Sequence, residues 1–299
     1  MSAGRMHADE VDIDVGLVVR LLAAQFPQWA GLPVRPVPSA GTDNALYRLG
    51  DDMVMRLPRI DWAIGDVAKE QQWLPKLAPF LPLAIPVPLA KGQPGEGYPW
   101  DWSIYRWLEG EEATVKGMAD PRQAAIDLAQ FIAALQRIDV TGAPPAGRGV
   151  PLAQRDAPTR TAIENLHGLI DTAAVTALWD AAIEAPMWHG SPVWVHGDLR
   201  PGNLLAVKGR LSAVIDFGGL GVGDPACDVM AAWMFLSAET RNVFLWALQV
   251  DQATWVRGRG WALSVGLIAL PYYQTTNPVL AEIARRAIQE ALADYSASA

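Results

Sequence analysis

The stretch Val-His-Gly-Asp-Leu-Arg-Pro-Gly-Asn at residues 195–203, followed by Asp-Phe-Gly at 216–218, decides how this 299-residue sequence is interpreted. Asn203 follows Asp198 by five residues, and Asp216 follows Asn203 by thirteen. Either short motif alone is typical of an ordinary turn. The functional indication therefore comes from their order and spacing together.

This spacing resembles the protein-kinase signature, in which a catalytic-loop Asp is followed by an Asn and then by the metal-binding Asp of Asp-Phe-Gly. His-Gly-Asp in place of His-Arg-Asp, with Gly-Asp-Pro-Ala-Cys-Asp at 223–228, resembles the aminoglycoside phosphotransferase family and related antibiotic kinases. The resemblance is strongest over residues 193–230, and the order of elements fits nearly the whole chain. It implies a two-lobed protein-kinase-like fold and transfer of the γ-phosphoryl of ATP or GTP to a hydroxyl.

The resemblance assigns roles to the three matched residues. Asp216 and Asn203 would hold Mg²⁺ through hard oxygen ligands, and Asp198 would orient the acceptor hydroxyl and take its proton. We expect Arg200 to face the γ-phosphate and help stabilise its charge; a solvated surface arginine is the alternative.

The residues around the motif are expected to support it. By resemblance, Asp228 would bond the catalytic-loop backbone from below. His196 is expected to be a packed loop residue rather than a base, and Asp224 a helix cap.

A kinase also needs a cation on its third strand and a carboxylate on the following helix. Arg56 and Glu70 fit these places, with Arg56 standing where the family carries a lysine. Ser39, Gly41 and Thr42 would belong to a phosphate-covering loop, although their segment does not match Gly-x-Gly-x-x-Gly.

Residues 103–110 resemble the segment that links the lobes and hydrogen-bonds the purine. Tyr105 and Trp107 lie in it, and Tyr105 would guard the back of the pocket, where its bulk would disfavour adenine and favour GTP. A core aromatic is the alternative for Tyr105.

The chain order predicts an α+β protein with a β-rich front and a helical remainder. Helices are expected over 12–26, 66–77, 159–170 and 172–185, and after the cap-plus-proline pairs at 120–121 and 277–278. Strands are expected over 34–37, 46–49, 53–57, 85–89 and 102–108, with an isolated hairpin at 204–215 around Lys208-Gly209-Arg210. We predict a nucleotide-binding lobe over 1–105 and a helical lobe with the catalytic loop and acceptor site over 106–299.

The composition of the chain indicates which binding partners and which cellular compartment to expect. The formal net charge of −8 does not suggest nucleic acid or anionic lipid as a partner. The single cysteine suits a reducing cytoplasm, residues 1–14 lack an apolar signal core, and the apolar run at 261–273 is too short to span a bilayer. We expect a cytoplasmic monomer or weak dimer that binds a nucleoside triphosphate and a small-molecule acceptor.

The acceptor itself stays open at this point. An aminoglycoside antibiotic would need a carboxylate-rich site, yet residues 150–299 carry 14 Asp and Glu against 10 Lys and Arg, net −4, and the first 149 residues are also net −4. Seven of the 13 Trp residues follow residue 150, and some could line a pocket for a macrolide. A choline-, sugar- or homoserine-like metabolite is a further alternative. A nucleotide-binding pseudokinase is another, suggested by Arg56 and the atypical phosphate loop.

Overall fold

The computed structural model describes residues 10–298, so most of the N-terminal segment examined for a signal core lies outside the described residues. Within these residues the chain forms two compact units, one of 10–79 and 84–109 and the other of 80–83 and 110–298. The described chain has a β-rich first part and a mainly helical second part, in agreement with the sequence.

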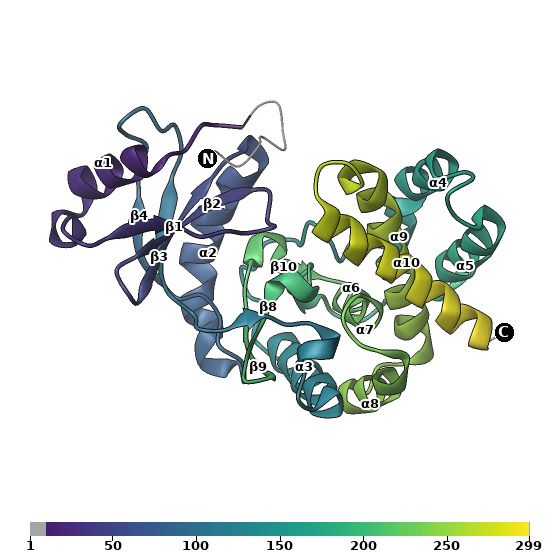
Figure 1. The fold of residues 1–299 in the computed structure, drawn as a ribbon. Helices are drawn as coiled ribbons and strands as arrows, with labels where there is room; N and C mark the ends of the chain where they lie inside the picture. Colours follow the sequence, from purple (N-terminus) through teal and green to yellow (C-terminus); the bar gives the residue numbers. More distant parts are fainter. Residues whose placement is uncertain (1–9, 299) are drawn as a thin grey trace. The chain divides into compact units, whose positions relative to one another are not determined.

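The first unit is built on an antiparallel five-stranded sheet with the order β1-β2-β3-β5-β4 (Figure 1). Its strands are β1 (Val34–Pro36), β2 (Asn44–Leu49), β3 (Met53–Pro58), β4 (Pro88–Gly92) and β5 (Trp102–Arg106). Its helices are α1 (Val15–Gln25) and α2 (Ile64–Leu77), with short 3₁₀ turns at 27–29 and 61–63.

Successive side chains of a strand point to opposite faces of the sheet, so every second residue of β3 lies on the same face. Met53, Met55 and Leu57 of β3 are buried in a cluster with Leu21 and Leu22 of α1. The intervening residues of β3 point to the opposite face, where α2 packs. Arg56 is therefore directed toward α2 by the period of the strand alone.

The second unit contains two small antiparallel sheets. The strand β7 (Val193–Val195) pairs with β10 (Gly221–Gly223), and β6 (Glu111–Glu112), β8 (Leu204–Val207) and β9 (Arg210–Val214) form the other sheet in the order β6-β8-β9. The hairpin at 204–215 was expected to be isolated, but it is part of a three-stranded sheet, because β8 also pairs with β6. Its turn is formed by Lys208 and Gly209, both with positive φ, which matches the twist of a tight hairpin.

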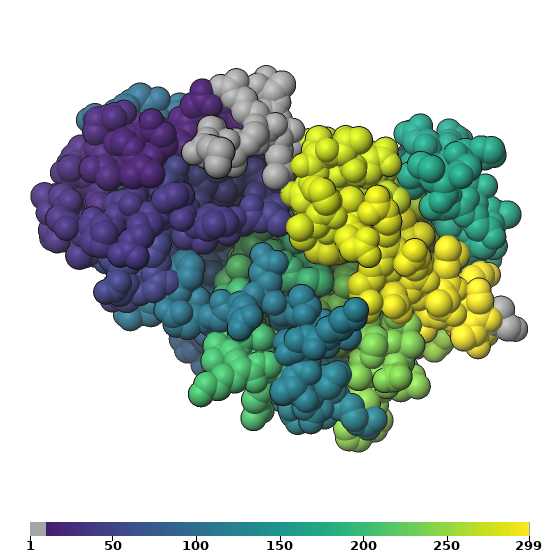
Figure 2. Space-filling model, in the orientation of Figure 1, coloured from purple at the N-terminus to yellow at the C-terminus, as the bar shows by residue number. Residues whose placement is uncertain are grey.

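Helices make up the rest of the second unit. They are α3 (Pro121–Gln136), α4 (Asp156–Asn165), α5 (Thr172–Glu184), α6 (Ala226–Val229), α7 (Ala231–Met234), α8 (Ala238–Leu248), α9 (Gln252–Tyr273) and α10 (Pro278–Ser298). Short 3₁₀ turns occupy 78–80, 115–117, 152–155, 201–203 and 217–219. The helix α9 is buried on nearly all sides and packs against α10, α5 and α4; Figure 2 shows α4 and α5 beside the C-terminal helices at the surface.

One expected helix and one expected strand differ most from the structure. The helix α4 begins at Asp156 rather than Thr159, because Pro158 lies in its first turn, where the missing N–H removes no helical hydrogen bond. It ends at Asn165 rather than 170, before Gly168 with its positive φ of 81°. The strand expected at 85–89 is displaced to Pro88–Gly92. No helix within residues 10–298 is long and apolar enough to cross a membrane.

Candidate active site

In the first unit, a buried carboxylate is held between a cation and a phenol. Nη1 of Arg56 donates to both carboxylate oxygens of Glu70, at 2.6 and 2.7 Å, and the hydroxyl of Tyr105 also donates to Glu70. Glu70 is only 2% exposed. The ion pair predicted from the sequence is therefore present, and Tyr105 on β5 is tied to it. Burial, and then the charge of Glu70, raise the pKa of Tyr105 far above its usual range, so the phenol stays protonated and donates.

The other predicted nucleotide contacts of this unit already have partners. The amide of Trp107 donates to the carbonyl of Asp52 at 2.8 Å, so another group of the linking segment would have to bond a base. The Gly41 amide donates to Oγ of Ser39 at 2.9 Å, and the Thr42 hydroxyl donates to Asp43 at 2.7 Å. Ser39, Gly41 and Thr42 lie in the loop between β1 and β2, and their hydrogen bonds are to residues of the same loop.

In the second unit, a buried carboxylate beneath the catalytic loop fixes the loop's backbone. The amides of His196 and Gly197 each donate to Asp228, at 2.8 Å. Burial raises the pKa of Asp228, and this effect outweighs the opposing influence of His196 and of the two amide donors. Asp228 therefore supports the loop from below, as expected. His196 is fully buried between the Ile215 carbonyl, the Asp198 amide and the Phe217 ring, which agrees with a packed residue rather than a base.

A glycine is required where His-Arg-Asp would have arginine. Gly197 has a φ of 83°, and a Cβ added there would lie 3.0 Å from the carbonyl oxygen of Gly219. A Cβ on Gly219 would in turn lie 2.8 Å from the carbonyl oxygen of His196. The catalytic loop and the turn after Asp-Phe-Gly thus pack backbone against backbone. Asp216 itself has a left-handed φ of 64°, a conformation that costs a non-glycine residue about 1–3 kcal/mol.

The carboxylate of Asp198 is surrounded by nitrogen donors. Arg148 contacts Oδ1, while Nε of Arg200 and Nδ2 of Asn203 donate to Oδ2 at 3.0 and 2.8 Å. An ionised carboxylate offers about four acceptor positions, so these three donors leave about one for a further hydroxyl. The side chain of Arg200 therefore contacts Asp198 and is not a solvated surface arginine.

The charges around Asp198 control its ionisation. Burial alone would raise its pKa, but the positive charges of Arg148 and then Arg200 outweigh burial and hold the pKa of Asp198 well below its ordinary value. Burial lowers the pKa of Arg200, but Asp198 and Asp216 more than compensate and raise it overall. These charges favour the ionised form of Asp198, and a carboxylate with a lowered pKa is a weaker base.

Asn203 lies immediately before the β8–β9 hairpin and Asp216 lies shortly after it. A backbone hydrogen bond at the open end of the hairpin keeps the two segments close. The amide of Ile215 donates to the carbonyl of Asn203 at 2.9 Å. Nδ2 of Asn203, which is buried, donates to both the backbone carbonyl and the carboxylate of Asp198. Within residues 10–298 no group of three or more His, Cys, Asp or Glu could hold a metal by itself. Two oxygen ligands fit Mg²⁺, which usually binds through one or two protein oxygens together with substrate phosphates.

Sequence reasoning missed two arginines of the second unit. Arg148 lies in the Gly/Pro loop before α4 and reaches Asp198 across fifty residues of sequence. Arg257 of α9 bonds both carboxylate oxygens of Asp224, at 2.9 and 3.1 Å, so Asp224 is an ion-pair partner as well as a cap for Ala226. Neither arginine belongs to a motif, and no local signal in the sequence marks them.

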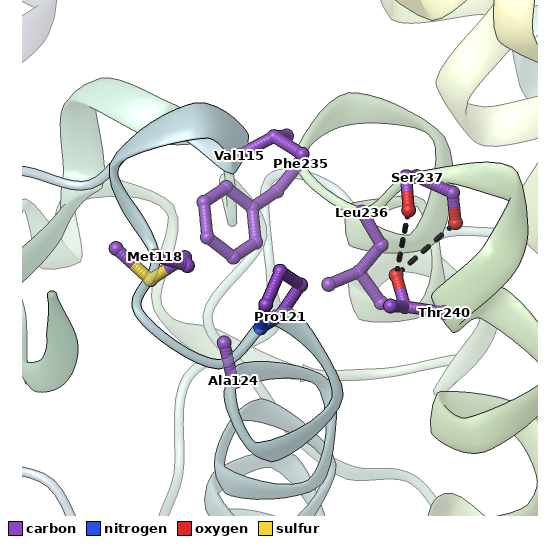
Figure 3. Close-up of a pocket in the computed structure, with 8 residues that line it drawn as sticks. All are labelled: Val115, Met118, Pro121, Ala124, Phe235, Leu236, Ser237 and Thr240. Carbon is purple, nitrogen blue, oxygen red and sulfur yellow. Dashed lines mark hydrogen bonds between the residues drawn. The ribbon is translucent and has the colours of Figure 1, made fainter.

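A shallow apolar pocket in the second unit contains none of the predicted site residues (Figure 3). It is lined by Val115, Met118, Pro121, Ala124, Phe235, Leu236, Ser237 and Thr240. Its two hydroxyl groups bond each other at 3.3 Å. The polar groups that converge on Asp198 lie outside it.

Comparison with known proteins gives a consistent result. Residues 34–261 match the model of the phosphotransferase enzyme family. No curated protein matches the chain. A solved structure described as the GDP and kanamycin complex of APH(2")-IIia is similar with a TM-score of 0.74 and 21% identity, over 93% of this chain and 98% of that one.

Two macrolide enzymes are similar as well. The macrolide 2'-phosphotransferase MphH from Brachybacterium faecium has a TM-score of 0.60 and 24% identity, over 92% of this chain and 98% of that one. A macrolide 2'-phosphotransferase type I has a TM-score of 0.63 and 19% identity, over 92% and 97%. At these identities the similarity shows the fold, which is the kinase-like fold expected from the catalytic motif.

Proposed function

Because this chain belongs to the phosphotransferase enzyme family, we propose that it transfers the γ-phosphoryl of ATP or GTP to a hydroxyl of a small molecule. The observation that carries the proposal is the convergence of Arg200 and Asn203 on the ionised carboxylate of Asp198, beside the hairpin that ends at Asp216. Solved structures of the same fold are described as GDP, ADP or ATP complexes, which supports a nucleotide donor.

In this proposal Asp198 receives the acceptor hydroxyl on its remaining acceptor position. Its low pKa favours orienting the hydroxyl over removing its proton early, and a loose phosphoryl-transfer transition state demands little early proton removal. Arg200 contacts Asp198, and the charge of Asp216 helps to raise the pKa of Arg200. Its remaining N–H groups would donate hydrogen bonds to the transferred phosphoryl group.

Asn203 and Asp216 would hold Mg²⁺, which when bound neutralises charge on the triphosphate. In the first unit, Arg56 fixed by Glu70 and Tyr105 would supply the cation for the donor phosphates. The loop with Ser39, Gly41 and Thr42 would cover these phosphates, and the segment around Trp107 would adjoin the base. The intact pair of Arg56 and Glu70 favours an active enzyme over a pseudokinase.

The test is transfer of labelled γ-phosphate from ATP and from GTP to a panel of hydroxyl acceptors. We expect Asp198→Asn to lower turnover on the order of 10²-fold or more while nucleotide binding persists. Asp216→Asn should weaken the Mg²⁺-dependent part of nucleotide binding. Glu164→Gln changes an exposed carboxylate of α4 and is the control. Equal turnover in Asp198→Asn and the unmodified enzyme would disprove the proposal.

A further inference from the structure

The two carboxylate oxygens of Asp198 are not equally occupied. Oδ2 accepts from both Nε of Arg200 and Nδ2 of Asn203, at 3.0 and 2.8 Å. Among residues 10–298, Oδ1 accepts a hydrogen bond from Arg148 alone. A carboxylate oxygen offers about two acceptor positions, so the remaining position of Asp198 belongs to Oδ1. An acceptor hydroxyl that donates to Asp198 would therefore share this oxygen with Arg148.

The guanidinium of Arg148 has unused donors beside this oxygen. One nitrogen, Nη1, makes both of its contacts, because it donates to the Gly197 carbonyl at 2.9 Å and to the Asp198 carboxylate. Nε and Nη2 donate no hydrogen bond to any residue in the described part of the chain, and the side chain is 37% exposed. The N–H groups of Nε and Nη2 are therefore available to a molecule bound at Asp198.

The segment that carries Arg148 is bonded on both sides of this residue to β10 and the residue that follows β10. The Ala146 amide donates to the Val222 carbonyl at 3.1 Å, and the Asp224 amide donates to the Gly149 carbonyl at 2.7 Å. The two glycines of β10 permit this approach, since a Cβ on either one would overlap the backbone of the segment. The strand β10 also pairs with β7, which leads directly into the catalytic loop. The backbone therefore fixes Arg148 beside that loop.

The chemistry of a guanidinium limits what can lie next to the reacting hydroxyl. It donates hydrogen bonds, accepts none and stays positively charged. Two donors that bond one carboxylate oxygen lie about 4–5 Å apart, a gap that a substituent on the carbon beside the reacting hydroxyl can bridge. An oxygen on that carbon accepts from Arg148, whereas an ammonium there meets like charge and finds no acceptor.

We propose that Arg148 is a specificity-determining residue that selects the acceptor by the group beside the reacting hydroxyl. That group is an oxygen, as in a vicinal diol or a 2-hydroxy acid, and a vicinal ammonium is rejected. The hydroxyl oxygen bonds the γ-phosphorus, the bond to the nucleoside diphosphate breaks, and the hydroxyl proton passes to solvent by way of Asp198. This inference rests on the proposed phosphotransferase function and deepens it, because it names the class of acceptor.

The experiment uses the full chain with Mg²⁺ and nucleoside triphosphate, and three acceptors that differ only beside the hydroxyl. They are trans-1,2-cyclohexanediol, cyclohexanol and trans-2-aminocyclohexanol, in which the neighbouring carbon carries an oxygen, no polar group or an ammonium. Acceptor-dependent release of nucleoside diphosphate is measured for each at neutral pH. We expect kcat/KM for the diol to be on the order of tenfold above that for cyclohexanol, with the amino alcohol lowest.

Variants of Arg148 connect this order of preference to the guanidinium. Loss of the cation changes the pKa of Asp198 equally for every acceptor, so the ratios of kcat/KM between acceptors isolate the contact. In Arg148→Gln we expect the ratio of diol to amino alcohol to fall on the order of tenfold or more. Arg148→Lys keeps the charge and should still reject the amino alcohol. Arg122→Gln changes an exposed arginine of α3 and is the control, with all three ratios unaltered.

Three outcomes would overturn the inference. One is a kcat/KM for the amino alcohol that equals or exceeds that for the diol, and another is the same set of ratios in Arg148→Gln as in the unmodified enzyme. The third is no turnover of any of the three acceptors while Asp198-dependent triphosphate hydrolysis is measurable. Each of these leaves the proposed function standing, whereas hydrolysis and transfer that survive Asp198→Asn would disprove the function itself.

Discussion

Arg148 contacts Oδ1 of Asp198 although fifty residues separate the two in the chain. The contact brings a loop of no recognisable motif onto the residue at the centre of the catalytic motif. It accounts for the largest part of the influence that keeps Asp198 ionised against burial. The pKa of Asp198 thus depends in part on a residue outside the motif.

Removing the guanidinium of Arg148 should change the pH dependence of activity. The nearby cation favours the ionised form of Asp198, so its loss in Arg148→Ala raises the pKa of Asp198 toward, or above, the ordinary value of about 3.9. We expect the acid limb of the pH profile of kcat/KM to move to higher pH in Arg148→Ala and to stay near its original place in Arg148→Lys. Profiles of Arg148→Ala and the unmodified enzyme that superimpose would contradict the assignment.

Breaking the ion pair in the first unit should destabilise the protein. Arg56→Ala leaves Glu70 buried with only the Tyr105 hydroxyl as a side-chain partner, and an uncompensated buried charge costs about 3–5 kcal/mol. We expect a loss of about 3 kcal/mol in urea denaturation at neutral pH, and a smaller loss for Arg56→Lys. Arg35→Ala removes an exposed arginine of β1 and serves as the control. A loss in Arg56→Ala no larger than in Arg35→Ala would show that the pair is not stabilising.

Adding one carbon at Gly197 should be costly. Alanine must adopt the left-handed φ of 83° and place Cβ 3.0 Å from the Gly219 carbonyl oxygen. We expect Gly197→Ala to lower the free energy of unfolding by about 1–3 kcal/mol and to reduce turnover by displacing Asp198. Gly65→Ala on α2, where a Cβ meets nothing within 4 Å, should be neutral or stabilising. The same response at both glycines would refute the close approach.

The single cysteine should report opening of the catalytic loop. Cys227 is fully buried with its thiol 4.0 Å from the Gly197 carbonyl oxygen, and burial, then the charge of Asp228, raise its pKa well above the ordinary value. Since the thiolate is the reactive form, Ellman's reagent should not react with the native protein at pH 8 and should react with one thiol per chain in urea. Labelling should follow the same unfolding curve as tryptophan fluorescence. Rapid labelling of native protein would mean that the loop opens without unfolding.

The site could be predicted from the sequence where its residues are close in the chain. Asp198, Asn203 and Asp216 lie within one loop and one hairpin, so local spacing fixes their arrangement. Arg56 and Glu70 are fourteen residues apart, and the strand period with the following helix brings them together. Arg148 and Arg257 meet their carboxylates only through the packing of distant segments, and nothing local specifies such contacts.

The errors in the fold also have physical causes. The helix was expected to begin at residue 159, which excludes Pro158, but proline is compatible with the first turn of a helix. The strand β6 is only two residues long, Glu111–Glu112, and exposed, so no hydrophobic alternation marks it. Its pairing with β8 depends on the neighbouring strand rather than on its own sequence.

The hairpin formed by β8 and β9 has a consequence for the evolution of the gene. Asn203 and Asp216 both lie at its open end, so a single short gene segment encodes the two residues proposed to hold Mg²⁺ together with the spacer between them. Recombination within the gene would transfer them intact. Arg148, whose side chain contacts Asp198, is encoded well upstream and can be exchanged without disturbing that segment.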